Sequence, residues 1–136
     1  MIPKFRVWLP NPDVERMLRV KALVFEYDKT RCVCGYAYDF YLEDEDATIM
    51  QSTGLLDKNG QEIFEGDIVK RYKSPFFVAE WEYQIETVVK REACLLLGKK
   101  LGKNFATMSF GSPFTKSDLL EVIGNIYENP ELLKEE

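Results

Sequence analysis

The sequence predicts a mainly β protein, either all-β or α+β with a minor helix. Apolar and polar residues alternate along most of its segments, which is typical of strands with one buried and one solvent-facing side. In residues 77–86 the polar positions include Glu80, Glu82 and Glu86, and we expect these glutamates to face solvent. Turn signals separate the alternating segments, above all in residues 57–60, where Asn-Gly favours a hairpin.

The length and composition agree with this fold class and exclude several others. The chain has 136 residues, of which 46% are hydrophobic and 30% are charged. These shares exclude a disordered tail. No apolar run reaches the roughly 18–20 residues that a membrane-spanning helix needs. A chain of this size buries enough surface to be stable without disulfide bonds.

The alternating segments divide the chain into two units and a tail. An N-terminal β unit is expected in residues 1–53 and a small SH3-like β-barrel unit in residues 54–129. Residues 130–136 are expected to form a short terminal helix or tail. The alternating segments of the first unit are residues 5–9, 18–24 and 31–42. The barrel strands are expected near residues 63–72, 76–84, 86–97, 105–110 and 119–128.

Two segments of the C-terminal half are less regular. Residues 97–104 hold two glycines and three lysines and are predicted to form a basic loop. Residues 119–127 suit a helix or a strand, and Gly124 with the β-branched residues favours the strand. Asn129, Pro130 and Glu131 then cap and begin a short helix. The predicted core residues are Trp8, Phe25, Tyr38, Phe40, Ile68, Trp81, Tyr83, Val122 and Ile126.

The strongest functional statement in the composition is that the chain contains no histidine. Serine–histidine and cysteine–histidine nucleophile pairs are therefore excluded, together with histidine bases and histidine metal ligands. The sequence also lacks the glycine-rich loops that bind phosphates or dinucleotides. We expect no catalytic residues, no cofactor and no enzymatic activity, although a carboxylate or serine–lysine hydrolase stays open.

Three cysteines, Cys32, Cys34 and Cys94, are predicted to be free thiols that pack as small apolar residues in a reducing compartment. The alternative is a three-thiolate metal site completed by an acidic residue. The N-terminal residues lack the apolar stretch of a signal peptide, so we expect a cytoplasmic protein with no membrane contact.

Two basic clusters stand out in a chain whose net charge is −5. Aromatic residues lie beside the first cluster, as in proteins that bind single-stranded nucleic acids. The simpler interpretation is a charged rim that keeps the protein in solution. The candidate nucleic-acid or partner contacts are Lys70, Arg71 and Lys73 in the first cluster, and Lys90, Arg91, Lys99, Lys100 and Lys103 in the second.

Three segments, residues 2–8, 50–70 and 121–133, together resemble the YopX family of phage and prophage proteins. The resemblance implies a cytoplasmic bacterial or phage accessory protein that is rich in β structure and oligomeric. It brings no catalytic residues with it. The Gly-Asp-Ile-Val stretch at residues 66–69 also resembles the start of many SH3-like barrels, which is an analogy of fold only.

Two functions follow as hypotheses. The first is a non-enzymatic accessory protein that acts by self-assembly, as a homo-oligomer, or by binding host or phage proteins. The alternative is a nucleic-acid-binding small β-barrel that uses the two basic clusters, which the acidic net charge disfavours.

Overall fold

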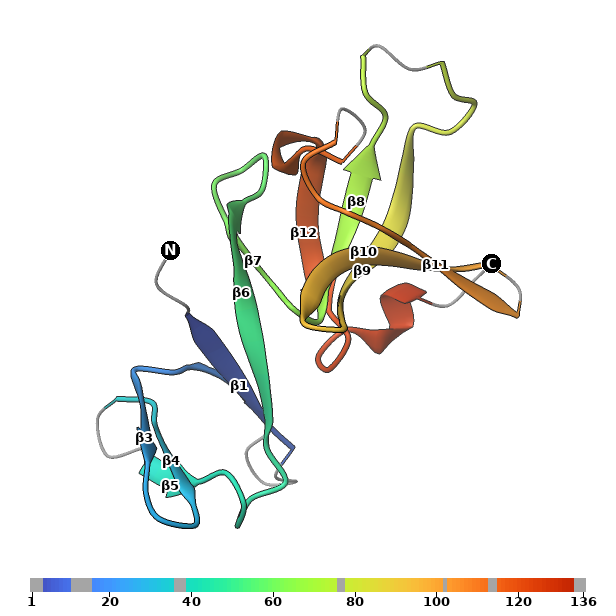
Figure 1. Cartoon of the computed structure of the whole chain (residues 1–136). Coiled ribbons are helices and arrows are strands. Elements are labelled where there is room, and N and C mark those ends of the chain that lie inside the picture. Colours follow the sequence, from blue (N-terminus) through green and yellow to red (C-terminus); the bar gives the residue numbers. More distant parts are fainter. Residues whose placement is uncertain are drawn as a thin grey trace. The chain divides into compact units, whose positions relative to one another are not determined.

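The structure, a computed structural model, describes residues 4–10, 16–35, 39–75, 78–101, 103–112 and 115–133. It confirms a mainly β protein, with twelve strands and two short 3₁₀ helices in those ranges (Figure 1). The chain divides into two compact units, Met1–Ser52 and Thr53–Glu136. No helix within the described ranges is long and apolar enough to cross a bilayer.

The first unit contains two antiparallel arrangements. β1 pairs with β2 on one side and with the first half of β6 on the other, while β3, β4 and β5 form a separate three-stranded sheet. The strands are β1 (Phe5–Leu9), β2 (Arg16–Arg19), β3 (Ala22–Phe25), β4 (Thr30–Val33), β5 (Asp39–Tyr41) and β6 (Thr48–Leu56).

Two alternating segments of this unit were each expected to form one strand, but each is divided between two strands. Residues 18–24 are shared between β2 and β3 because the N–H of Val20 donates to Phe5 and the N–H of Lys21 donates to Val33. The N–H groups of these two successive residues therefore hydrogen-bond to strands of two different sheets. In residues 31–42, β4 ends at Val33 and β5 begins at Asp39.

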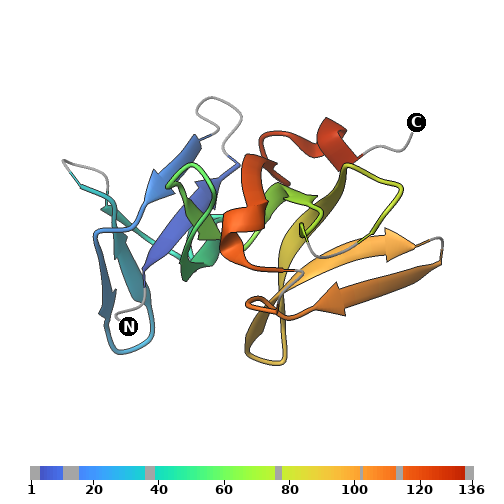
Figure 2. The same cartoon turned by 90° about the horizontal axis from the view of Figure 1, so that it is seen from above.

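The second unit is built around a five-stranded antiparallel sheet in the order β11-β10-β9-β8-β12. The sheet curls, as Figure 1 shows for the long ribbons of β9 and β10, and Figure 2 shows β10 and β11 side by side in orange. The strands of this sheet are β8 (Asp67–Tyr72), β9 (Tyr83–Arg91), β10 (Cys94–Leu101), β11 (Asn104–Met108) and β12 (Leu120–Asn125). A further strand of this unit, β7 (Glu62–Phe64), pairs with β6 instead.

Several strand boundaries predicted for this unit are wrong. A turn at Gly66, whose φ is 88°, splits residues 63–72 into β7 and β8. Residues 78–82 contain no strand, and residues 76 and 77 lie outside the described ranges. The predicted strand 86–97 folds back at Glu92 and Ala93, whose φ values of 49° and 68° suit a two-residue hairpin.

The basic loop predicted for residues 97–104 is instead mostly a hairpin, because β10 continues to Leu101 and β11 begins at Asn104. Gly98 leaves room for the ring of Phe105 on the neighbouring strand, because a Cβ at residue 98 would overlap that ring. The strand predicted for residues 105–110 ends earlier, at Met108.

The C-terminal segment forms a strand, as Gly124 and the β-branched residues indicated, and this strand is β12. A 3₁₀ helix, η1 (Ser117–Leu119), precedes it, and another, η2 (Pro130–Leu133), follows after Pro130. The predicted cap, Asn129, accepts the backbone N–H of Leu132 at its carbonyl, but its side-chain Oδ1 accepts the N–H of Asn125 at 3.2 Å.

The core predictions are partly confirmed. Trp8 and Ile68 are buried, whereas Phe40, Trp81, Val122 and Ile126 are half-buried. The prediction is wrong for Phe25, which is 80% exposed at the end of β3, and for Tyr83, which is 38% exposed. Tyr38 lies outside the described residues. The core of the second unit consists of Ile63, Val69, Val88, Leu97 and Leu120.

One buried carboxylate holds the β6–β7 hairpin against β12. Asp57 Oδ1 accepts the N–H groups of Asn59 and Gln61, both at 2.9 Å, and thereby shapes the predicted turn. Its Oδ2 accepts the N–H of Val122 at 2.9 Å, and the N–H of Lys58 donates to the carbonyl of Leu120. Residues of the 50–70 and 121–133 segments therefore meet at this carboxylate.

We predict that Asp57→Ala lowers the free energy of unfolding by about 2–4 kcal/mol, because three part-buried hydrogen bonds from N–H groups of the turn and of β12 lose their acceptor. Asp57→Asn should lower the free energy of unfolding by a smaller amount, because its amide oxygen can still accept hydrogen bonds from either the turn or β12. Urea denaturation measures both variants, with the exposed Gln61→Ala as the control. Equal stability of Asp57→Ala and the control would contradict this role.

A candidate binding surface on the five-stranded sheet

The two faces of the sheet in the second unit differ in character, as its register shows. Val69 lies opposite Glu86, and both side chains point to the core. The next pair, Lys70 and Ile85, belongs to the opposite face because successive side chains alternate. The sides of β9 are thus reversed from the prediction, which placed Ile85 inside and Glu86 in solvent.

The core face holds a buried ion pair between Arg71 of β8 and Glu86 of β9. Arg71 Nε donates to Glu86 Oε1 at 2.8 Å and its Nη2 donates to Oε2 at 2.9 Å. The ring of Trp81 lies 5.2 Å from the guanidinium carbon. Only 7% of Arg71 and 2% of Glu86 are exposed. This bidentate geometry makes Arg71 part of the core, with its charge balanced by Glu86.

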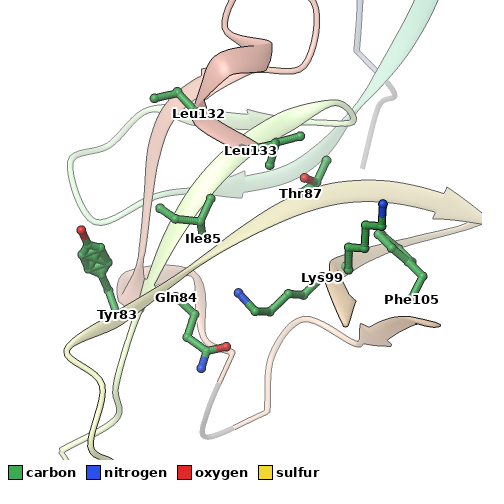
Figure 3. A pocket seen from close by; sticks show the side chains of 10 residues that line it. Tyr83, Gln84, Ile85, Thr87, Lys99, Phe105, Leu132 and Leu133 are labelled. Atoms are coloured by element: carbon green, nitrogen blue, oxygen red, sulfur yellow. The ribbon is translucent and has the colours of Figure 1, made fainter. Parts of the chain in front are cut away.

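The other face carries a groove of about 540 Å³, which we call the sheet groove (Figure 3). Ile85 and Thr87 of β9 lie along it, and Leu132 and Leu133 of η2 extend towards them from the terminal segment. Phe105 lies at the far side. The lining residues are Tyr83, Gln84, Ile85, Thr87, Gly98, Lys99, Lys100, Phe105, Leu132 and Leu133.

Both aromatic rings of the sheet groove have a cation beside them. Lys70 Nζ lies 4.4 Å from the ring centroid of Tyr83, and the guanidinium carbon of Arg91 lies 4.9 Å from that of Phe105. Tyr72 packs against Tyr83 with ring centroids 5.8 Å apart. Each of these contacts places positive charge at the electron-rich face of a ring.

Tyr72 is fixed at its polar end as well. Its hydroxyl donates to Glu121 Oε1 at 2.7 Å, and this hydrogen bond raises the pKa of Tyr72 above its ordinary value. Lys58 Nζ lies 4.3 Å from the Tyr72 ring. Tyr72 therefore supports the ring of Tyr83 at the end of the groove.

The predicted basic residues are distributed over several environments. Lys99 and Lys100 line the sheet groove, and Lys70 and Arg91 contact its two aromatic rings. Arg71 is buried in the core. The remaining three, Lys73, Lys90 and Lys103, are exposed and are not among the lining residues.

Sequence reasoning missed most of the other groove residues. Tyr83 was predicted to lie in the core because the apolar positions of residues 77–86 were expected to form the buried face of the strand. Phe105, Leu132 and Leu133 had no signal of their own, because the curl of the sheet and the return of the chain after β12 bring them together.

The three cysteines are divided between the two units. Cys32 and Cys34 have their sulfurs 3.8 Å apart in the first unit, while Cys94 is exposed at the start of β10. Burial raises the pKa of Cys32 to about 12 and also raises the pKa of Cys34. Among the described residues, no group of three histidine, cysteine, aspartate or glutamate side chains is placed to hold a metal ion.

The chain matches the family model described as "YopX protein" over residues 4–134. It is similar to the crystal structure of protein EF1440 from Enterococcus faecalis, with 26% identity and a TM-score of 0.52 over 98% of this chain and 99% of that one. It also shares the fold of protein yopX from Bacillus subtilis, with 18% identity and a TM-score of 0.63 over 96% and 98% of the two chains. No curated protein sequence matches it.

We predict that removing one partner of the Arg71–Glu86 pair, as in Arg71→Met or Glu86→Leu, lowers the free energy of unfolding by about 3–5 kcal/mol. Each single variant leaves an uncompensated charge in the core. The double variant should recover most of this loss, because both charges leave together. A double-mutant cycle from urea denaturation gives the coupling energy. Additive single losses would show that the two side chains act independently.

We also predict that iodoacetamide modifies Cys94 first and Cys32 last in the folded protein at pH 8. The thiolate is the reactive form, and a pKa of about 12 leaves Cys32 protonated, so its rate should keep rising with pH up to pH 10. Mass spectrometry of the labelled peptides measures each site, with the urea-unfolded chain as the control. Equal rates for Cys32 and Cys94 in the folded protein would contradict this order.

Proposed function

The chain belongs to the YopX family, and we propose that it is a non-enzymatic phage or prophage accessory protein that acts by binding protein chains in the bacterial cytoplasm. Its first partner in this proposal is a second copy of itself. The contact is the outer edge of β11, residues 104–108, which we call the β11 edge.

The position and composition of β11 support this proposal. β11 is the terminal strand of the five-stranded sheet and pairs on one side with β10. All five of its residues are exposed. Its sequence, Asn-Phe-Ala-Thr-Met, contains no charged residue and no proline, which are the usual means of preventing a sheet edge from pairing with another chain.

The apolar surface around the hairpin also supports a protein partner. Leu101, Phe105 and Met108 are 52%, 39% and 38% exposed on β10 and β11. An antiparallel pair of two β11 strands centred on Ala106 would bring these side chains of both copies to one continued sheet. Strand addition of this kind gives affinity through main-chain hydrogen bonds.

Binding is favoured over catalysis by the side chains that the chain offers. The sequence has no histidine. The two thiols with an altered pKa, Cys32 and Cys34, are shifted towards the unreactive protonated form. A host or phage protein that supplies a strand to the β11 edge is the other partner that this chemistry fits.

The proposal predicts that the purified protein has a mass above the 15.9 kDa of one chain at micromolar concentration. Ala106→Lys should reduce the mass to one chain, because symmetric pairing would place two lysines directly opposite each other. Light scattering coupled to size exclusion measures the mass.

Two matched variants control this experiment. Ala106→Val keeps the strand uncharged and should retain the assembly, and Val78→Lys adds the same charge at a residue that is 99% exposed outside the sheet. A wild-type mass equal to one chain would overturn self-assembly. An unchanged mass for Ala106→Lys would overturn the β11 edge as the contact.

A further inference from the structure

We infer that the sheet groove binds single-stranded nucleic acid, with bases stacked at Tyr83 and Phe105 and phosphates held by Lys99 and Lys100. The inference concerns the face of the sheet, and the backbone edge of β11 has no part in it. Its starting point is the charge of the groove. The lining residues include two lysines and neither aspartate nor glutamate, in a chain whose net charge is −5.

The aromatic residues give the groove its affinity for bases. Tyr83 and Phe105 are 38% and 39% exposed, although both belong to strands of the sheet. Phe105 is held in place because its ring covers Gly98. Exposed rings on a sheet surface are the platforms on which unpaired bases stack, and every base can use them.

The cations beside the rings extend these platforms. Arg91 lies 4.9 Å from the Phe105 ring and Lys70 lies 4.4 Å from the Tyr83 ring. Bases stack on the guanidinium plane of arginine as well as on aromatic rings. A base at either position therefore has a positive charge within reach of its own phosphate.

The shape of the site favours a single strand over a duplex. The groove has a volume of about 540 Å³, within the range of roughly 300–1,000 Å³ that holds small-molecule ligands. The bases of a duplex are stacked on each other and cannot enter such a recess. Gln84, which is half-buried, supplies a polar side chain to the groove lining, and its amide suits the edges of unpaired bases.

The test measures the fluorescence anisotropy of a labelled twelve-residue oligo(dT) with the full chain at low salt. We expect binding below about 100 μM, since even non-specific nucleic-acid binding reaches roughly 10⁻⁴–10⁻⁶ M. The logarithm of the affinity should fall with the logarithm of the salt concentration with a slope of about −1.4 if two phosphates are held.

Two variants remove the proposed contacts. Phe105→Leu keeps an apolar side chain but removes the ring, and it should weaken binding by about fivefold to a hundredfold. The double variant Lys99→Gln/Lys100→Gln should weaken binding and flatten the salt dependence. Its matched control is Lys73→Gln/Lys103→Gln, which removes the same charge from two exposed residues outside the groove lining.

Several results would overturn the inference. These are no binding at 100 μM, an equal loss in the control double variant, or equal affinity for a DNA duplex. Tighter binding of an acidic peptide would assign the groove to a protein, and equal affinity for free dTMP would reduce it to a nucleotide pocket. Because the mass of each variant is measured separately, a failure here is distinguishable from a failure of assembly through the β11 edge.

Discussion

The second unit depends on the carboxylate of Asp57, which joins two parts of the chain that are 65 residues apart. One oxygen shapes the β6–β7 turn and the other accepts the N–H of Val122 on β12. The neighbouring turn makes a related connection, because the carbonyl of Gly66 accepts the N–H of Ile126. β12 is an outer strand of the sheet, and these contacts fix it beside β8. The segments that resemble the YopX family therefore carry the framework of this unit, while the groove lies mostly on β9, β10 and β11.

The sheet uses its two faces for different purposes. The core face places apolar side chains around the bidentate pair of Arg71 and Glu86, whose charges balance each other. The opposite face carries Lys70 and Lys100, and Lys100 lies across from the exposed Phe105 of β11. Within the first basic cluster, strand alternation thus separates a structural arginine, Arg71, from Lys70 on the opposite face. Charge counts along the sequence do not separate these two roles, whereas the register does.

The features predicted correctly from the sequence are those that depend on neighbouring residues. The turn at residues 57–60 contains Asn-Gly, and the strand after residue 119 is marked by Gly124 and β-branched residues. The hairpin at Glu92 and Ala93 was missed because neither residue is a usual turn former and the apolar pattern continues through it. Glu86 was placed in solvent because its partner, Arg71, is 15 residues away and belongs to another strand. The groove could not be predicted, since it depends on how the sheet curls towards η2.

The two tryptophans of the chain lie in different units. Trp8 is buried on β1 of the first unit, and Trp81 lies under the guanidinium of Arg71 in the second. Each unit therefore carries one tryptophan, in an environment that unfolding would change. Single-tryptophan versions of the chain would report on the two units separately, one emission signal for each. Whether the units melt together or in sequence thus becomes a spectroscopic question, which two denaturation curves recorded at the same wavelength would answer.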